Sequence, residues 1–594
     1  MHAGSLLSRP EAAGFYRRGG TTASLPREKG GAGRHRRAAA TNYQGVSDFL
    51  GTTAPDKNDV MVPPEPPHWV VVQRPKGGST VNEKSGVSDV LMRGSRATLS
   101  RRELTKSGLA LGLSASAIAA LLTTARSSNA AAQEIAADAP KPEELRVLYV
   151  GVEANVDSMN YAAQKYGDEK GIKVTVDSFP QTAMREKLFA ELSSQSPYYD
   201  VVLIDHPWGA ATAPHLLDLR PLMANPEITD PAVLAIDDFV PQTWAQVAYD
   251  QTKPPVPPME FQLPEFLVSG PMDLDDAMGS NLALCGLPFH PNVLTMAYRL
   301  DYFEDPELQA KFEEANGREL TPPEDWDEFV EVTEFFTQSH NPDSPTPYGA
   351  TLMAKKHESL YTDWRVWNRT FGVVEINEKL EPTFNSEDGI AATSFYGDLI
   401  NEYKVVPPEA TTWTWDEVTT AFGSGQTAIA MNYHRMLLDP DIEAEGGKVG
   451  FAKVPGKRQE DGTILRAPHY GTYYLGLNRY AKNPRWAYDL ILTATSPDWM
   501  KEYSQFLFHG SRVSYYEDPE VIATRPEYWP TFAESLHIGY ARPRISVYVE
   551  YSETIQAEVS RYLLGEQSVE DALNNAATKI RELFERNNYY QFVE

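Results

Sequence analysis

Apolar side chains in residues 145–204 switch between two spacings, one typical of strands and one typical of helices. The helical spacing is clearest in 182–193, where Met184, Leu188 and Leu192 fall on one face. A stretch of helix length, 159–166, separates the first two of three strand-like segments, which are 145–150 (LRVLYV), 172–176 and 199–204 (YDVVLI). The last segment is rich in Val and Ile, as a strand buried in a parallel sheet is. This alternation predicts an open α/β sheet.

Helical spacing returns in three later parts of the chain, at 323–337, 415–421 and 555–583. Ser568 stands before the last helical pattern with Asp571 three residues on, an arrangement similar to a capping box and typical of a helix start. Proline-rich residues 254–271 indicate a surface insertion. The chain therefore has enough elements after residue 144 for two or three domains.

An export signal is indicated by residues 100–122, SRRELTKSGLALGLSASAIAALL. Arg101, Arg102 and Lys106 precede an uncharged stretch from 107 to 125, and small residues suited to signal cleavage follow at 128–132. The arginine pair resembles a twin-arginine signal, which carries folded proteins across the membrane. We therefore expect 100–132 to be a cleaved signal peptide for the periplasm; a retained membrane anchor is the alternative. No Cys follows the apolar stretch, so we expect no lipid anchor.

Residues 1–99 lack a sustained apolar period and contain Gly pairs, Pro clusters and basic runs. Such a composition buries too little surface to offset the entropy of ordering. Met92 lies eight residues before Ser100, where an initiator would bring the signal to the N-terminus. We interpret 1–99 as a non-native or disordered extension with Met92 as the true start; a genuine basic extension is the alternative.

Charge separates the two parts of the chain. Residues 1–132 hold 18 of the 54 Lys and Arg residues and 9 of the 82 Asp and Glu residues, which leaves 36 basic and 73 acidic residues after position 132. A surface this acidic repels nucleic acid and anionic membranes, so we expect neither as a partner. Cys285 is the single cysteine, which excludes an internal disulfide.

Five motifs between residues 144 and 588 together resemble the extracellular solute-binding proteins of carbohydrate ABC importers, the maltose-binding-protein-like class. One departure from the family pattern is Arg299, where Asn is usual. The motifs are Gly286–Phe289 with Asp301–Phe303, Pro322–Phe329, Phe422–Met431, Pro468–Leu477 with Lys482-Asn483, and Arg542-Pro543-Arg544 with Tyr548.

The resemblance implies two α/β lobes joined by crossing segments, with the ligand between them. Carried over, lobe one comprises 144–291 and 469–508, and lobe two comprises 292–468 and 509–594. It also implies a membrane ABC permease as partner, no cofactor and no catalytic residues. We expect a monomer.

Candidate ligand-binding residues follow from the chemistry of sugars, whose C–H faces stack on aromatic rings and whose hydroxyls bind planar polar groups. Ligands of open α/β sheets bind at the carboxyl ends of strands. Core packing is an equal alternative for Trp367 and Tyr473. The candidates are Glu153, Asn155, Asp205, Trp208, Asp363, Trp364, Trp367, Tyr433, His434, Arg435, Tyr470 and Tyr473.

Five histidines stand at segment junctions that the family places near the ligand. No pair has a metal-ligand spacing such as H-x3-H, so we expect hydrogen-bonding groups and no metal site. They are His206, His290, His434, His469 and His509.

The sequence thus predicts a binder of a sugar, oligosaccharide or polyol. One alternative is a secreted carbohydrate-active enzyme, which needs two carboxylates across a cleft. With 73 acidic residues some pair is always available, so this signal has little weight. The other alternative is the same fold binding a polyamine or peptide, which the negative charge favours.

Overall fold

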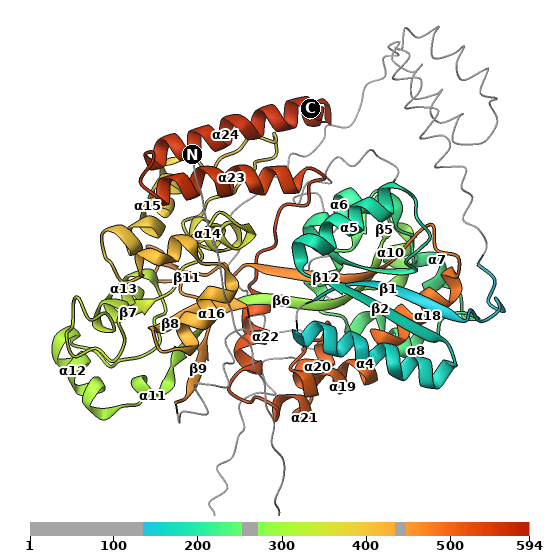
Figure 1. The fold of residues 1–594 in the computed structure, drawn as a ribbon, viewed down its shortest axis with the longest axis horizontal. Helices are drawn as coiled ribbons and strands as arrows, with labels where there is room; N and C mark the ends of the chain where they lie inside the picture. Colours follow the sequence, from blue (N-terminus) through green and yellow to red (C-terminus); the bar gives the residue numbers. More distant parts are fainter. Residues whose placement is uncertain (1–134, 152, 252–270, 434–446, 593–594) are drawn as a thin grey trace, which may run out of the picture. The chain divides into compact units, whose positions relative to one another are not determined.

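The structure is a computed structural model that describes residues 135–151, 153–251, 271–433 and 447–592 (Figure 1). The expected signal at 100–132, the extension 1–99 with Met92, and the candidates His434 and Arg435 lie outside these residues. Within the described ranges, no helix is both long enough and apolar enough to cross a membrane.

The predicted strand–helix alternation is confirmed in lobe one. Strand β3 is buried along its whole length, as its Val- and Ile-rich sequence indicated. β1 pairs with β2 and with β3, both in parallel. The elements are β1 (Glu144–Val150), α4 (Glu153–Lys170), β2 (Lys173–Phe179), α5 (Gln181–Ser193) and β3 (Val201–Asp205).

Short elements follow β3 and complete this side of lobe one. They connect β3 to the long strand β6 and include the small antiparallel pair β4–β5. They are η1 (His206–Trp208), α6 (Gly209–Thr212), η2 (Ala213–His215), α7 (Arg220–Met223), α8 (Pro231–Leu234), η3 (Ile236–Asp238), α9 (Pro241–Trp244), β4 (Ala248–Tyr249), α10 (Leu274–Gly279) and β5 (Ala283–Leu284).

Strand β6 (Gly286–Arg299) belongs to both lobes. Its first half pairs antiparallel with β12 (Tyr470–Leu477), which in turn pairs with β3. Its second half pairs antiparallel with β8 (Thr427–Tyr433) and β9 (Val449–Ala452). The resulting strand order is β2-β1-β3-β12-β6-β8-β7, and Figure 1 shows β6 extending from the strands of lobe one toward β8 and β9.

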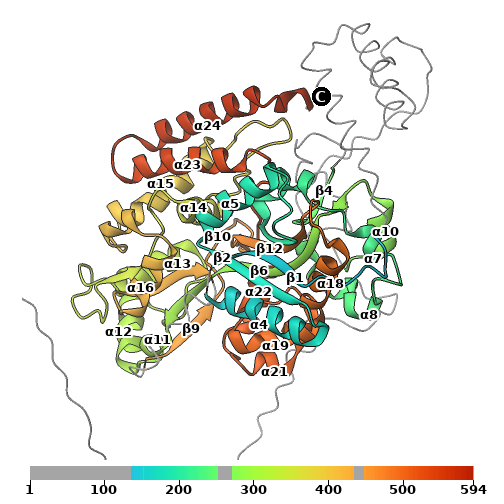
Figure 2. The same ribbon diagram turned by 45° about the vertical axis from the view of Figure 1, so that its right-hand side comes forward.

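Lobe two is built on the second half of β6, and its helices confirm the predicted helix starts. The side chain of Ser568 accepts a hydrogen bond from the backbone N–H of Asp571 at the start of α24. At the start of α13, the side chain of Asp325 accepts a hydrogen bond from the backbone N–H of Glu328. Helices α14, α15, α23 and α24 pack together, as Figure 2 shows. The elements are α11 (Leu300–Phe303), α12 (Pro306–Asn316), α13 (Trp326–Phe335), β7 (Tyr348–Ala350), α14 (Glu358–Thr370), α15 (Glu387–Asn401), η6 (Pro408–Thr412), α16 (Trp415–Gly423), β10 (Lys457–Arg458), β11 (Ile464–Leu465), α23 (Tyr548–Leu563), α24 (Val569–Arg586) and η9 (Tyr589–Phe592).

The segment between β12 and α23 contacts lobe one beyond the expected boundary at residue 509. The backbone N–H of Val240 donates to the carbonyl of Ser511 over 2.9 Å, and Arg512 Nη1 donates to the carbonyl of Leu234 over 2.9 Å. Residues 511 and 512 therefore pack with lobe one, although the family pattern assigned them to lobe two. The helices of this segment are α18 (Pro484–Ala494), α19 (Pro497–Glu502), η8 (Tyr503–Phe506), α20 (Val513–Glu517), α21 (Pro519–Ile522) and α22 (Trp529–His537).

In the part of the chain that the structure describes, three crossing segments join the lobes and are hydrogen-bonded side by side. The N–H of Leu294 in β6 donates to the carbonyl of His469 over 2.9 Å. Tyr540 then donates to Pro468 over 2.8 Å and accepts from Tyr470 over 3.1 Å. These contacts bring the crossings at 292–294, 468–470 and 540 together as one hinge.

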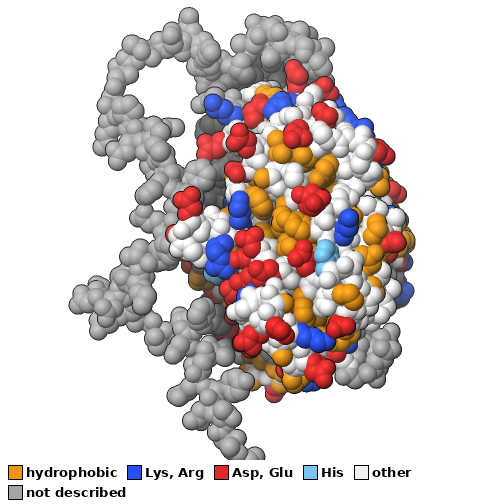
Figure 3. All heavy atoms as spheres, turned by 90° about the vertical axis from the view of Figure 1, so that its left-hand side faces the viewer, with side chains coloured by type: hydrophobic (Ala, Val, Ile, Leu, Met, Phe, Trp, Pro, Cys, Tyr) orange, Lys and Arg blue, Asp and Glu red, His pale blue; other side chains and the backbone are white. Residues whose placement is uncertain are grey.

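The surface of lobe two is mixed in charge. Figure 3 shows Asp and Glu side chains spread over one face, with Lys and Arg side chains scattered between them. On this face the basic side chains do not form a continuous patch of the kind that a nucleic acid backbone requires.

Candidate site between the lobes

A buried arginine next to the hinge contacts one carboxylate from each lobe. Arg542 follows the crossing at Tyr540, and its side chain is 7% exposed. Nη2 donates to Asp205 Oδ1 over 2.6 Å, at the carboxyl end of β3 in lobe one. Nη1 donates to Glu358 Oε1 over 3.1 Å, in the first turn of α14 in lobe two. One guanidinium therefore links the two lobes.

The two carboxylates differ in how firmly they are held. Besides Arg542, Glu358 accepts hydrogen bonds from three side chains of α23, those of Tyr548, Ser552 and Gln556. Asp205 accepts one further side-chain hydrogen bond, from Gln181 Nε2 over 3.2 Å. Burial raises the pKa of Asp205 to about 6, although the neighbouring Arg542 opposes the rise.

Two buried histidines, His206 and His469, lie beside this ion pair, with ring centroids 6.5 Å apart. Burial and the nearby arginines hold the pKa of both well below the ordinary value, so both rings are neutral. The hydroxyl of Tyr433, at the end of β8, lies 2.5 Å from His469 Nδ1. His469 Nε2 and Arg542 Nε are both buried without a hydrogen-bond partner among the described residues, so each has unused capacity for a hydrogen bond.

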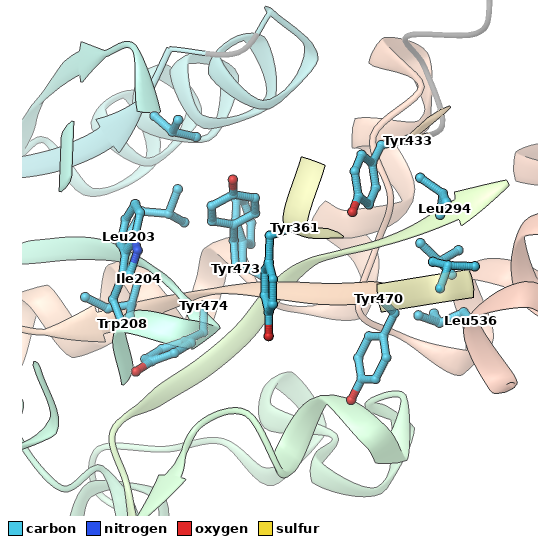
Figure 4. Close-up of a cluster of buried hydrophobic side chains, with 14 of the residues drawn as sticks. Leu203, Ile204, Trp208, Leu294, Tyr361, Tyr433, Tyr470, Tyr473, Tyr474 and Leu536 are labelled. Carbon is cyan, nitrogen blue, oxygen red and sulfur yellow. The ribbon is translucent and has the colours of Figure 1, made fainter. Parts of the chain in front are cut away.

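The aromatic candidates of the hinge and of lobe one lie in a buried cluster that Figure 4 shows. Tyr470 uses its hydroxyl internally, because it donates to the carbonyl of Gln242 and accepts from Gln246 Nε2. Tyr473 is paired with Asp205 across β12 and β3 and accepts a weak hydrogen bond from Gln181 over 3.3 Å. Trp208 lies in η1 and is 5% exposed, among hydrophobic core residues.

Three candidates of α14 are part of the lobe-two core. Trp364 is fully buried and donates from Nε1 to Thr393 over 2.9 Å. Trp367 stacks on Trp326 with ring centroids 3.7 Å apart, so it packs in the core, which was the alternative to ligand binding for this residue. Asp363 Oδ2 accepts from the N–H of Met353 and from the hydroxyl of Tyr396, both over 3.1 Å. The contacts that these three residues make are internal to lobe two.

Glu153 begins α4, directly after the first strand, and Asn155 lies in its first turn. This is the predicted position, at the carboxyl end of β1. Their side chains are outside what the structure describes, as are His434 and Arg435.

Sequence reasoning named Asp205 as a candidate but missed Arg542 and Glu358, its partners in this site. Arg542 is 337 residues from Asp205 and 184 from Glu358, so no local pattern connects them. The only sequence signal for Arg542 was the Arg-Pro-Arg motif, which contributed to the family resemblance but did not indicate a function for this residue. Among the described residues, no three His, Cys, Asp or Glu side chains are grouped to hold a metal ion.

Comparison with known proteins places this architecture in a family. The family described as "Bacterial extracellular solute-binding protein" matches residues 153–501. A probable amino-acid ABC transporter periplasmic-binding protein of Sinorhizobium fredii is 22% identical over 466 residues, which are 77% of this chain and 94% of the relative.

Solved structures share the fold at similar identity. Maltose-bound MalE3 of T. maritima is 22% identical with a TM-score of 0.59, and covers 74% of this chain and 99% of its own. A ribitol complex of an ABC transporter solute-binding protein from Agrobacterium radiobacter is 19% identical with a TM-score of 0.58, and covers 75% and 99%. Their two-lobed fold confirms the predicted fold class. Both the family and the fold are those of transport proteins rather than enzymes.

The family match spans more than half of the chain, and the pair of α/β lobes agrees with it; the chain belongs to the bacterial extracellular solute-binding proteins.

Proposed function

We propose that this protein captures a sugar, oligosaccharide or polyol outside the cytoplasmic membrane and delivers it to an ABC permease. The observation that carries the proposal is the polar cluster at the hinge, where neutral His469, Asp205 and Tyr473 lie together with buried aromatic rings. Neutral rings and a carboxylate exchange hydrogen bonds with hydroxyl groups, and aromatic faces stack on sugar C–H groups.

The solutes of related folds support this class. The compared structures hold maltose and ribitol, and another protein of similar fold from Agrobacterium vitis holds D-mannitol. These are neutral polyhydroxylated compounds. Such ligands suit a site in which the cation Arg542 is already paired with two carboxylates.

A thermal-shift screen tests the proposal. We expect maltose, maltotriose, ribitol or D-mannitol to raise the melting temperature, because a ligand at 100 times its dissociation constant adds about 2.7 kcal/mol of stability. Spermidine, a tripeptide and the standard amino acids belong in the same screen, since one relative is named as an amino-acid binding protein. A shift with one of these and none with the neutral compounds would reject the sugar and polyol class.

Export, processing and partners are further parts of the proposal. The twin-arginine pattern supports passage to the periplasm and cleavage before Gln133. We also propose that the protein is a monomer that meets a membrane permease, as the family resemblance implies for the permease. Mass spectrometry of the periplasmic fraction is expected to find an N-terminus between Ala131 and Gln133. Changing Arg101 and Arg102 to Lys is expected to retain the protein in the cytoplasm. A mature product that begins before Ser100 would contradict this proposal.

A further inference from the structure

The ion pairs of Arg542 are unequal in a way that bears on lobe movement. Glu358 is fixed to α23 of lobe two by Tyr548, Ser552 and Gln556. The other ion pair joins Arg542 to Asp205 of lobe one, and the backbone nitrogen of Arg542 lies 3.3 Å from His206 Nε2 of the same lobe. Arg542 is therefore held from both lobes, and one of its two ion pairs must break when the lobes separate.

We propose that Arg542 is a positioning residue for solute binding, which ties Asp205 of lobe one to Glu358 of lobe two when the lobes are closed and so holds Asp205 in place. This inference rests on the proposed function insofar as Asp205 is a solute contact. Its structural part, that Arg542 sets the balance between open and closed lobes, holds for any solute.

The Arg542–Asp205 ion pair is buried, which strengthens the attraction between the two charges. Asp205 is 2% exposed and Arg542 is 7% exposed, so solvent screens their attraction little. Removing one partner of a buried pair leaves the other charge unpaired, which is unfavourable. Opening the lobes rehydrates Asp205. Loss of Arg542 therefore favours the open form.

The measurement is the distance between the lobes in the full-length protein without solute. Nitroxide labels are attached after Gln164→Cys in α4 of lobe one and Glu314→Cys in α12 of lobe two, two exposed positions. Cys285 is fully buried and stays unlabelled. Double electron–electron resonance then gives the populations of short and long distances.

Arg542→Gln is expected to increase the ratio of open to closed protein by roughly fivefold or more, the lower range of a coupling between two sites. Asp205→Asn and Glu358→Gln are also expected to increase the ratio of open to closed protein, because each removes one of the two ion pairs of Arg542. Arg542→Lys is expected to give a smaller change, since one ammonium replaces two guanidinium nitrogens that reach different carboxylates.

Arg544→Gln is the matched control. Arg544 is also buried and lies two residues away, but its guanidinium donates to the carbonyl of Ala248 and stacks on Tyr249, both in lobe one. Among the described residues it has no carboxylate partner and so does not link the lobes. Its distance distribution is expected to match that of the wild type.

Circular dichroism melts identify the variants that fold, and only those variants are compared. If Arg542→Gln does not fold, Glu358→Gln and Asp205→Asn test the proposal instead. Unchanged distances in the folded variants would overturn the proposal, and so would equal opening in Arg544→Gln. Because no solute is present, failure here is distinct from failure to bind sugars.

Discussion

Asp363 shows how the interior of lobe two affects a single carboxyl group. It is 1% exposed, and burial raises its pKa from 3.8 to about 7, although hydrogen bonds from Met353 and Tyr396 oppose the rise. A carboxyl whose pKa is higher in the folded state stabilises the protein fully below the unfolded value. Its contribution is lost as the pH rises from about 4 to 7.

Asp363→Asn is expected to remove this pH dependence, because the amide cannot ionise. The free energy of unfolding of the variant, relative to the wild type, is expected to rise between pH 4 and pH 8 by on the order of 2–4 kcal/mol. Urea unfolding at both pH values measures it. Asp461→Asn is the control, since Asp461 lies in an exposed turn. If the difference in free energy of unfolding between Asp363→Asn and the wild type did not change with pH, the raised pKa of buried Asp363 would be contradicted.

Trp208 is one of the candidates for which the structure changes the expectation. The sequence placed it after a central strand as a platform for solute stacking. The structure places it in the hydrophobic core at 5% exposure. Trp208→Ala is therefore expected to lower the free energy of unfolding by about 3–5 kcal/mol, as cavities left by large aromatic residues do.

Urea unfolding and solute titration on the same Trp208→Ala protein separate the two roles. A stability close to that of the wild type, together with a loss of affinity of about 2 kcal/mol or more, would identify a ligand platform instead of a core residue.

At the scale of elements, helix α24 begins where its sequence indicated. Ser568 accepts a hydrogen bond from the N–H of Asp571 at 3.1 Å, which satisfies one of the free donors of the first turn. Ser568→Ala is expected to lower the free energy of unfolding by about 1 kcal/mol. The control is Thr578→Ala, an exposed residue within α24 whose hydroxyl bonds only to its own helix. Equal effects in both variants would argue against capping.

At the scale of the whole molecule, the hinge predicts movement on binding. Three adjacent crossings among the described residues join the lobes, and each lobe brings its own polar groups to the junction. A solute that contacts both lobes favours the closed form, because only that form makes all the contacts.

Small-angle scattering of the exported protein is expected to show a smaller radius of gyration with a solute identified by the thermal-shift screen. The control is a solute that binds too weakly to saturate the protein, because it shows how added solute alone affects the scattering. An unchanged radius at saturation would contradict lobe closure and favour a rigid site.

The sequence alone determined the first three strands, several helices and the capped start of the last helix. These features depend on neighbours a few residues apart, so local spacing of apolar and polar side chains is sufficient to predict them. The agreement holds for β1 to β3, for α13 and for α24. The family instead followed from the resemblance of five motifs spread along the chain.

Only the tertiary structure decided which side chains meet at the junction. Arg542 contacts Asp205 and Glu358 across 337 and 184 residues of sequence, and residue 512 joins lobe one through Leu234. The burial of Trp208 likewise depends on elements that pack over it from elsewhere in the chain. Contacts of this kind are set by how the elements pack in space, which the local period of a sequence does not encode.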